Sequence, residues 1–323
     1  MMHHEGLRDI DCVICGTCVA DMLVRPVPLS VPVGGGRLFH VDPIEVVTGG
    51  IVCNTGIAMR RLGMRVAAAS LVGTDPWGQF VRDRLAAEGI DTTALDTDAA
   101  QATSTTAVLV APDGERSFAH HVGAPRTLGL DFVRRHAATF ARGRVALVGY
   151  FGLLPALEPV LAGALAAIKA AGCTVALETG GSGGSLAELA PALPLIDIYV
   201  PSRDEAAHQT GLADPRDIIA CYRGHGAAGL VGIKLGAQGT LLSPAAGEFV
   251  EIPCVPAPGP VIDTTGAGDS LLAGLLTGLL RGLPLRGAGL LGAATAACCV
   301  TGLGAVAGLR SFDETWALSR AVS

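Results

Sequence analysis

Residues 263–269 read Asp-Thr-Thr-Gly-Ala-Gly-Asp, and an almost uninterrupted apolar segment, residues 270–280, follows them. Two glycines leave the backbone free to turn sharply. The periodic Leu and Ala residues beyond Asp269 predict a buried helix that stops near Gly282 and Pro284. This stretch is therefore expected to be a loop that leads into the N-terminus of a core helix.

A loop of this kind is suited to binding negative charge. The first N–H groups of a helix have no partner within the helix, and the helix dipole is positive at this end. Gly266, Ala267 and Gly268 can therefore surround a phosphate or an oxyanion with donors. Asp269, in the first turn, can accept the proton of a hydroxyl held beside these donors. A base next to an anion hole is the equipment that phosphoryl transfer to an alcohol requires.

A simpler interpretation is that Asp263 and Asp269 only cap the helix, as aspartates near a helix N-terminus often do. Capping explains one aspartate, but it leaves two carboxylates, six residues apart around a Gly-Ala-Gly loop, without a common role. We therefore favour a ligand-binding loop and expect the Asp269 carboxylate to face a cavity. A carboxylate inside the core, or turned away from every cavity, would end the case for an enzyme that transfers a phosphoryl group.

A second glycine motif lies far upstream. Gly49-Gly50-Ile51-Val52-Cys53-Asn54 precedes Leu62-Gly63. Together with residues 263–269, this motif resembles the two signatures of the ribokinase family of carbohydrate and nucleoside kinases. Further matches at residues 72–78 and 234–239 extend the resemblance over almost the whole chain. Two distant motifs in the right order are far more specific than either motif alone.

The resemblance implies an α/β fold. The expected architecture is a three-layer α/β/α sandwich with a mostly parallel central sheet, and a small β-sheet that serves as a lid over the sugar. Residues 1–323 are expected to form a single ribokinase-like domain, with lid strands contributed by about residues 19–47 and 103–121. The lid often mediates dimer contacts in this family, so the resemblance also implies a homodimer through the lid.

The activity that the resemblance implies is that of an ATP-dependent carbohydrate kinase. Such an enzyme transfers the γ-phosphoryl group of ATP to a hydroxyl of a small sugar with Mg²⁺, and a monovalent cation is a further cofactor to consider. A nucleoside kinase of the same fold is the alternative. No GxxxxGK[ST] phosphate loop is present in the sequence, so ATP is expected to bind at the anion hole and the surrounding strand ends.

The resemblance also assigns roles to individual residues. Asp269 is expected to be the general base, and the anion hole is expected to consist of Gly266, Ala267 and Gly268. The expected acceptor-binding residues are Asp21, Gly49, Gly50, Asn54 and Asp269. The expected nucleotide-binding residues are Lys234, Gly236, Gly239, Thr264, Gly266 and Gly268.

Three of these residues also have purely structural interpretations. Asp21 is compatible with a turn or a surface carboxylate, and Asn54 with an N-cap of the following helix. Lys234 is compatible with an ordinary hairpin. The residue types still suit the binding roles, because a carboxylate accepts two hydroxyl hydrogen bonds and an amide both donates and accepts.

Two positions depart from the family pattern. Glu205 matches the acidic end of a motif that serves magnesium and phosphate binding, but Ser202 replaces the Asn that begins it. An indirect metal contact through Glu205 is expected, although acids are favoured in the first turn of any helix. Residues 149–152, Gly-Tyr-Phe-Gly, stand where ribose kinases have an acidic sugar contact, so ribose is not favoured. Glu178 could serve a different hydroxyl or cap a loop.

Hydrophobic patterning predicts the elements around these motifs. Extended runs are expected at 12–18, 19–24, 37–47, 66–72, 93–95, 103–110 and 115–121, and helices at 54–61 and 77–88. Pro112-Asp113-Gly114 is a hairpin turn signal between two of these runs. From residue 145 onward strands and helices alternate over 145–148, 157–171, 174–177, 186–189, 196–200, 203–210 and 229–233. Such alternation predicts a parallel sheet with ligands at its carboxyl ends.

Composition and charge limit the classes of binding partner that we expect. The net charge of -6 argues against a nucleic-acid surface or an anionic-membrane surface. Residues 1–11 lack the apolar core of a secretory signal, and the uncharged segment 287–309 is rich in Gly and Ala, so we expect a helix packed on a sheet rather than a membrane span. The nine cysteines lie mainly in apolar runs, which fits a reducing cytoplasm and disfavours metal binding at Cys12, Cys15 and Cys18.

A hydrolase is the competing class of enzyme. Residues 180–184 match the G-x-S-x-G pattern with Ser182 as nucleophile, and Asp204 with His208 or His225 follows in hydrolase order. Five small residues match this pattern easily, however, and no His-Gly-Gly-Gly segment is present to form the oxyanion hole. This hypothesis also leaves residues 263–269 without a function.

A catalytically silent, kinase-like binding protein is a third class. The fold and the ligand pocket would then be kept without turnover. The presence of Asp269 disfavours this class, because the residue with the chemical role is retained.

Overall fold

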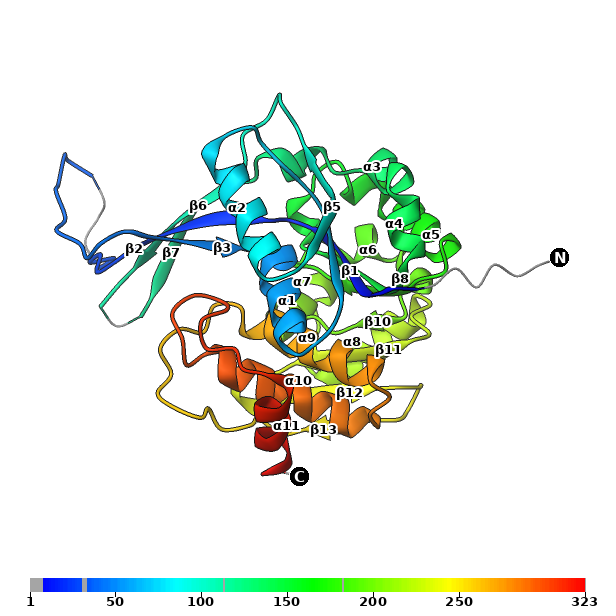
Figure 1. Cartoon of the computed structure of the whole chain (residues 1–323). Coiled ribbons are helices and arrows are strands. Elements are labelled where there is room, and N and C mark those ends of the chain that lie inside the picture. The colour runs from blue at the N-terminus through cyan, green and yellow to red at the C-terminus, as the bar shows by residue number, and fades with distance from the viewer. Residues whose placement is uncertain (1–7, 31–33, 113, 182, 323) are drawn as a thin grey trace.

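The computed structural model describes residues 8–30, 34–112, 114–181 and 183–322, and it contains two sheets of different size (Figure 1). The large sheet has nine strands in the described residues, in the order β13-β12-β11-β10-β9-β8-β1-β4-β5. Their bounds are β1 Ile10–Gly16, β4 Val66–Val72, β5 Asp91–Thr97, β8 Gly143–Gly149, β9 Thr174–Glu178, β10 Ile198–Tyr199, β11 Leu230–Lys234, β12 Thr240–Ser243 and β13 Val250–Ile252.

Neighbouring strands from β5 to β11 are parallel, whereas β12 and β13 pair antiparallel at one edge. The interior strand β1 is buried at every position, as expected for a parallel strand covered on both faces. Successive side chains of β1 enter different cores, because strand residues point alternately to opposite faces. Val13 and Cys15 belong to one core, and Cys12 and Ile14 to the other.

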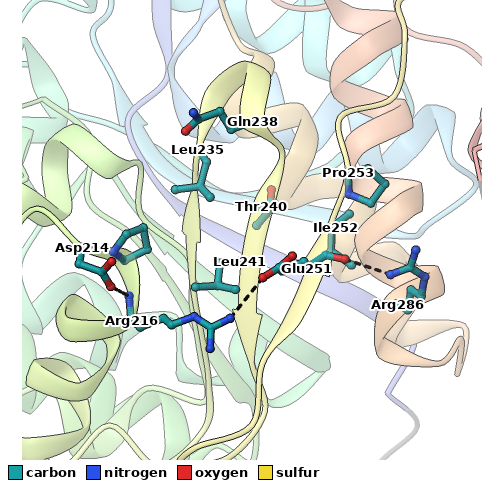
Figure 2. Close-up of a pocket in the computed structure, with 11 residues that line it drawn as sticks. Asp214, Arg216, Leu235, Gln238, Thr240, Leu241, Glu251, Ile252, Pro253 and Arg286 are labelled. Carbon is teal, nitrogen blue, oxygen red and sulfur yellow. Dashed lines mark hydrogen bonds and ion pairs between the residues drawn. The ribbon is translucent and has the colours of Figure 1, made fainter.

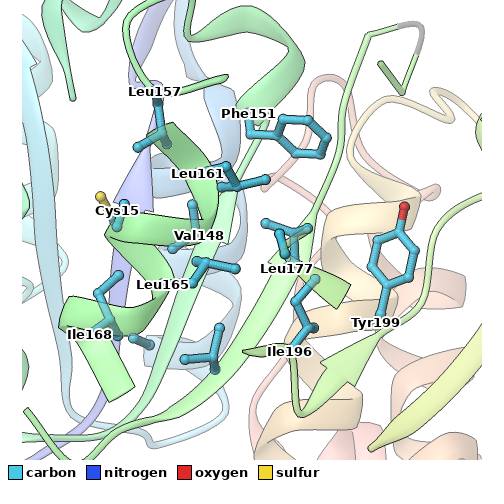
Figure 3. Packing of buried hydrophobic residues seen from close by; sticks show 14 of the residues in the cluster. Cys15, Val148, Phe151, Leu157, Leu161, Leu165, Ile168, Leu177, Ile196 and Tyr199 are labelled. Carbon is cyan, nitrogen blue, oxygen red and sulfur yellow. The ribbon is translucent and has the colours of Figure 1, made fainter. Parts of the chain in front are cut away.

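Helices cover both faces of this sheet. One core includes residues of α3 Leu130–Arg135, α4 Ala137–Ala141, α5 Leu161–Ala170, α6 Leu186–Leu189, α7 Arg203–Thr210 and α8 Pro215–Gly224. Figure 3 shows part of this core, where Leu161, Leu165 and Ile168 of α5 pack towards strand residues such as Val148. The other core includes residues of α1 Gly50–Arg61, α2 Pro76–Ala87, α9 Ala267–Leu280 and α10 Leu285–Cys299, with α11 Phe312–Arg320 packed on α10. The predicted α/β/α sandwich is confirmed.

The small sheet has the strand order β3-β2-β6-β7 and projects to one side of the large sheet, with α1 and α2 against its inner end (Figure 1). Its strands are β2 Val19–Val24, β3 Glu45–Gly49, β6 Ser104–Val110 and β7 Arg116–His121. Strands β2 and β6 are parallel, and the other pairs are antiparallel. A small separate sheet from residues 19–47 and 103–121 was predicted, and the structure contains it with β3 extending to Gly49.

Several predicted boundaries are wrong for identifiable reasons. The run 37–47 is strand only from Glu45, since Pro43 lacks the backbone donor that a ladder needs. The strand predicted at 12–18 is β1, two residues earlier. The helix predicted from Asn54 begins at Gly50, so Asn54 lies inside α1 and is not its N-cap. The uncharged segment 287–309 is helical only to Cys299, and none of the described helices is long and apolar enough to cross a membrane.

Helices α9 and α10 approach each other closely through glycines. A Cβ atom built on Gly278 would lie 2.6 Å from the Cα atom of Ala288. A Cβ atom on Gly274 would lie 2.7 Å from the Cα atom of Gly292, and one on Gly292 would lie 2.7 Å from the carbonyl oxygen of Leu271. The backbones are therefore in contact, which fixes the helix that carries residues 267–269.

Gly278→Ala should destabilise the protein by about 1–3 kcal/mol, because the added methyl group meets backbone atoms that cannot move aside cheaply. Gly163→Ala in α5 is the matched control, since its Cβ atom would meet only Leu130 Cδ2 at 3.7 Å. Alanine has a higher helix propensity than glycine, so this control should be neutral or should stabilise the protein by up to about 1 kcal/mol. Urea unfolding measures the free energy of unfolding of both variants. Equal changes in the two variants would contradict the close contact between α9 and α10.

Candidate active site

The site lies where strands of the large sheet end and α9 begins. Gly149 ends β8 and Tyr150 follows it, Glu178 ends β9, and Lys234 ends β11. These strands are parallel, so their carboxyl ends meet at one edge of the sheet, which is where α/β proteins bind ligands. The N-terminus of α9 brings Asp269 to the same edge, as its contacts with Asn54 and Tyr150 show.

Residues 263–269 have the predicted loop-to-helix geometry. Helix α9 begins at Ala267, and its N-cap Gly266 has φ 75°, a left-handed conformation that glycine adopts without strain. A Cβ atom on Gly266 would also lie 2.4 Å from Ala305 Cβ, so only glycine fits. No side chain caps this helix end. The Ala267 N–H donates to the Thr264 carbonyl oxygen at 3.3 Å, so an anion bound by all three N–H groups of residues 266–268 would replace this contact.

Asp269 lies in the first turn of α9 and does not cap its helix. Its Oδ2 atom accepts hydrogen bonds from Asn54 Nδ2 at 2.8 Å and from the Tyr150 hydroxyl at 2.7 Å. Burial raises the pKa of Asp269, while the Asn54 and Tyr150 donors and the Lys234 charge oppose that rise. The surroundings of the carboxylate are therefore polar, unlike an apolar core.

The Asp269 carboxylate is almost inaccessible to water in this structure. The residue is 4% exposed. Asn54 and Tyr150 occupy the hydrogen-bonding positions of Oδ2 that an acceptor hydroxyl would need. In this structure the carboxylate is covered by polar side chains, and an acceptor has to displace one of these donors or reach the other oxygen.

Lys234 and Glu178 form a buried ion pair beside the loop. Lys234 Nζ donates to Glu178 Oε1 at 2.9 Å, and both side chains are almost inaccessible to water. Burial raises the pKa of Glu178 to about 7, although the Lys234 charge lowers it. Burial alone would lower the pKa of Lys234, but the carboxylates of Glu178, Glu205 and Asp269 outweigh it and raise the pKa, which keeps the ammonium charged. A Cβ atom on Gly268 would lie only 3.3 Å from Lys234 Nζ, so this cation adjoins the anion-binding loop.

Several polar atoms around the site are buried without a partner. They are Thr17 Oγ1, Asn54 Oδ1, Glu178 Oε2 and Thr179 Oγ1. A buried polar atom without a hydrogen bond costs about 1–3 kcal/mol, so such atoms normally have a reason. Their position beside Gly50, Asp269 and Lys234 fits a site that a hydroxyl-rich ligand or a hydrated cation completes.

Asp21 projects from β2 against Gly49. A Cβ atom on Gly49 would lie 1.9 Å from Asp21 Oδ2, so the glycine is required for this close approach. Burial raises the pKa of Asp21 to about 6, and a hydrogen bond with Thr106 opposes the rise. Gly50 has φ 77° and lies against Thr17 in the same way. The small sheet therefore presents a carboxylate to the turn that begins α1.

The structure brings together only some of the predicted residues. Asn54, Gly268, Asp269 and Lys234 are linked by contacts, and Asp21, Gly49 and Gly50 form a second group on the lid side. Glu205 forms a reciprocal capping box with Ser202, so its structural interpretation is confirmed. Gly236 and Thr264 are exposed, and the proposed hydrolase nucleophile Ser182 lies outside the described residues.

Sequence reasoning missed Tyr150 as a partner of Asp269. The signal was its place directly after a strand that ends in glycine, but a tyrosine there is also an ordinary core residue. Tyr150 has φ 58°, the sole positive φ of a non-glycine residue in the described chain. A Cβ atom on Gly180 would lie 2.6 Å from Tyr150 Cδ1, so this glycine makes room for the ring. An unusual backbone that persists beside a buried carboxylate points to function.

A cavity of about 540 Å³ lies at the antiparallel edge of the large sheet (Figure 2). Leu235, Gln238 and Thr240 line one side of it, and they neighbour the predicted nucleotide residues Lys234, Gly236 and Gly239. Arg216 donates to Glu251 across the cavity floor. The cavity is therefore adjacent to the β11–β12 turn rather than to Asp269.

A helix N-terminus without a side-chain cap lies beside a buried carboxylate at the carboxyl edge of a parallel sheet, an arrangement that suits α/β phosphotransferases acting on small molecules. Residues 11–311 of this chain match a family model described as "pfkB family carbohydrate kinase". The chain therefore belongs to the pfkB family of carbohydrate kinases, and the predicted ribokinase-like identity is confirmed.

Individual relatives agree with this assignment. A ribokinase of Haemophilus influenzae is 33% identical over 94% of this chain and 96% of its own length. A fructokinase of Klebsiella pneumoniae is 32% identical over 84% of this chain and 85% of its own. The solved structure of Arabidopsis thaliana ribokinase complexed with ribose and ATP superimposes with a TM-score of 0.82, at 22% identity over 96% of this chain and 99% of that one, and this likeness shows the fold.

Membership of this family establishes the reaction class. The protein is an ATP-dependent phosphotransferase that acts on a hydroxyl group of a sugar or a nucleoside. The competing hydrolase hypothesis, with Ser182 as nucleophile, is not needed to explain any feature of the described residues.

Lys234→Met should destabilise the protein by about 3–5 kcal/mol at pH 8, because it leaves the Glu178 carboxylate buried without its counter-charge. The double variant Lys234→Met/Glu178→Met should recover most of this loss, since two apolar side chains of similar volume replace the pair. Chemical unfolding at pH 8 measures the free energy of unfolding of the wild-type protein and of both variants. A double variant as unstable as the single one would contradict a compensated buried pair.

Proposed function

We propose that Asp269 is the general base of the kinase. The observation that carries this proposal is the hydrogen-bonded Asp269 carboxylate in the first turn of α9, next to uncapped N–H groups. In the proposed mechanism, Asp269 accepts the proton of the acceptor hydroxyl as its oxygen attacks the γ-phosphorus of ATP, and ADP leaves. Asn54 and Tyr150 orient the carboxylate and stabilise its charge.

The negative charge of the transferred group is proposed to be stabilised by the α9 N-terminus. The proposed donors are the N–H groups at Gly266, Ala267 and Gly268. That of Ala267 donates to the Thr264 carbonyl oxygen at 3.3 Å and would have to exchange this partner for the transferred group. Lys234 adds a cation on the side where its ammonium approaches Gly268. Gly236, Gly239 and Thr264 are proposed to hold the remainder of the nucleotide, which the cavity next to the β11–β12 turn supports.

The acceptor is proposed to be a small sugar bound between the two sheets. Asp21 and Asn54 offer oxygens and an amide suited to hydroxyls, and Gly49 and Gly50 let the ligand approach the backbone. The partnerless Thr17 Oγ1 and Asn54 Oδ1 support a ligand that is rich in hydroxyl groups. A nucleoside stays the alternative acceptor within the same reaction class.

Mg²⁺ fits the residues present. Glu178 Oε2 is buried and lacks a partner, and Glu205 adds negative charge nearby. The described residues contain no cluster of three metal-ligating side chains, which suits a cation held mainly by phosphates and water. Glu178 directly, and Glu205 indirectly, would hold the ion. When bound, Mg²⁺ neutralises phosphate charge. Dependence on a monovalent cation stays a prediction from the family resemblance.

Three further points belong to the proposal. We propose that residues 1–323 form one domain, because strands from β1 to β13 share the nine-stranded sheet and α9 and α10 contribute to one of its two cores. A homodimer through the small sheet and a cytoplasmic location are also proposed. The nine cysteines are free thiols, which supports a reducing compartment.

A coupled ADP-release assay over hexoses, ketoses, sugar acids and nucleosides tests this function. Asp269→Asn should lower kcat for the best acceptor by about 10²–10⁴-fold while leaving the fold intact, since a general base contributes this much. Asp204→Asn, an exposed carboxylate in α7, makes the same charge change outside the site and should leave kcat unchanged.

Near-wild-type turnover by Asp269→Asn would refute the base assignment. No ATP turnover with any acceptor would favour the silent binding protein. Inhibition by a serine-directed reagent, with Asp269→Asn fully active, would revive the hydrolase.

The KM for the acceptor should rise as pH falls from 8 to 5. Asp21 accepts sugar hydroxyls as a carboxylate, and with a pKa of about 6 it is mostly protonated at pH 5, so KM should rise about tenfold. Asp21→Asn should have a high KM at pH 8 and lack this pH step. Initial-rate kinetics at each pH separate KM from kcat, and a constant wild-type KM would exclude Asp21 from acceptor binding.

A further inference from the structure

One contact joins the small sheet to residues 263–269. Arg116, the first residue of β7, donates from Nη1 to Thr265 Oγ1 at 2.5 Å, and its Nη2 lies 2.6 Å from Asp263 Oδ1. The partners are 149 residues apart in sequence. A lid residue is therefore bound at two points to the loop that precedes the anion hole.

Both side chains of this contact are largely shielded from water. The exposed fractions are 14% for the Arg116 side chain and 4% for that of Asp263. Within the described part of the chain, only the pair of Lys234 and Glu178 is as well shielded. Pairs at the surface contribute little because water and salt screen them, whereas a shielded, two-point arginine contact holds its partners in a defined geometry. Arg116 therefore holds β7 and residues 263–265 in a defined relative position.

Asp263 links three segments. Its Oδ1 accepts from the Thr265 N–H at 2.7 Å as well as from Arg116, and its Oδ2 accepts from the Gly304 N–H at 2.9 Å. Gly266, the residue after Thr265, is the N-cap of α9 and packs on Ala305. The position of the anion hole therefore depends on a carboxylate that Arg116 holds from the lid.

The same sheet carries the proposed acceptor contact. Asp21 of β2 is paired with Val47 of β3 and with Thr106 of β6, and Thr106 is paired with His120 of β7. Hydrogen-bonded strands move together, so a ligand held by Asp21 also restrains the strand that carries Arg116. At the opposite edge of the sheet, Val47 Cγ2 would lie 3.7 Å from a Cβ atom on Gly304.

We propose that Arg116 is a positioning residue that fastens the small sheet to residues 263–265 and so couples acceptor binding to nucleotide binding. This inference rests on the proposed function. Because coupling is reciprocal, a nucleotide at the α9 N-terminus stabilises the small sheet, and an acceptor at Asp21 strengthens nucleotide binding. Arg116 acts through the loop and not on the reacting atoms.

Hydrogen–deuterium exchange with ADP and Mg²⁺ as the ligand tests this proposal. In the wild-type protein, the ligand should slow exchange in β6 and β7 about fivefold or more, the lower end of usual coupling. In Arg116→Gln, the ligand should still protect residues 264–270 but should no longer protect β6 and β7. Arg25→Gln is the matched control, since Arg25 pairs with Glu45 at an exposed part of the same sheet and should leave the coupling intact.

Two further variants separate the alternatives. Arg116→Lys keeps the charge but cannot hold Asp263 and Thr265 together through one planar group, so it should behave like Arg116→Gln. Full coupling in Arg116→Lys would overturn the two-point contact in favour of a simple charge effect. If Arg116→Gln unfolds, the double variant Arg116→Gln/Asp263→Asn removes the unpaired buried charge and should fold with the coupling still lost.

The outcomes for this inference and for the proposed function differ. ADP–Mg²⁺ binding by calorimetry, without any change in β6 and β7 of the wild-type protein, would overturn the coupling and leave the kinase function standing. Failure of the wild-type protein to bind ADP–Mg²⁺ would overturn both. Lid protection that survives in Arg116→Gln would show that another contact carries the coupling.

Discussion

The arrangement of the site depends on two carboxylates that are buried close together. Asp269 and Glu178 lie where water hardly reaches, and each would be costly to ionise alone. Lys234 compensates Glu178 directly, while Asn54 and Tyr150 donate to Asp269. The charges stay buried only while β9, β11, α1, α9 and the residue after β8 keep their relative positions. The order of strands in the large sheet is thus a requirement of the site as well as of the core.

Close backbone contacts provide the rigidity that such a site needs. The contact of α9 with α10 through Gly274 and Gly278 sets the helix whose first turn carries Asp269. At the other end of the site, Gly49 lets the Asp21 carboxylate lie against the turn before α1. Glycine is costly in a helix, by about 1 kcal/mol relative to alanine. Its use here shows that the approach of backbones matters more than local helix stability.

Sequence patterns predicted elements well where hydrophobic period and turn chemistry agreed. The strands at 19–24 and 66–72 have the predicted bounds, since short apolar runs are flanked there by clear breaks. Helix α8 was missed although Asp214-Pro215 is a start signal, with Asp214 capping the N–H of Arg216. The edge strands β12 and β13 were missed because they are short and pair antiparallel in an otherwise parallel sheet.

The sequence alone indicated the family and its layered fold through the resemblance of its motifs, and it indicated the loop at 263–269 through local spacing, periodicity and glycine chemistry. It also indicated Asp21, Asn54 and Asp269 as site residues through their motifs. Only the tertiary structure decided that Tyr150 covers Asp269 and that Arg116 reaches Asp263. The reason is physical: hydrogen bonds between segments more than 100 residues apart depend on sheet order and side-chain direction, which local sequence does not encode.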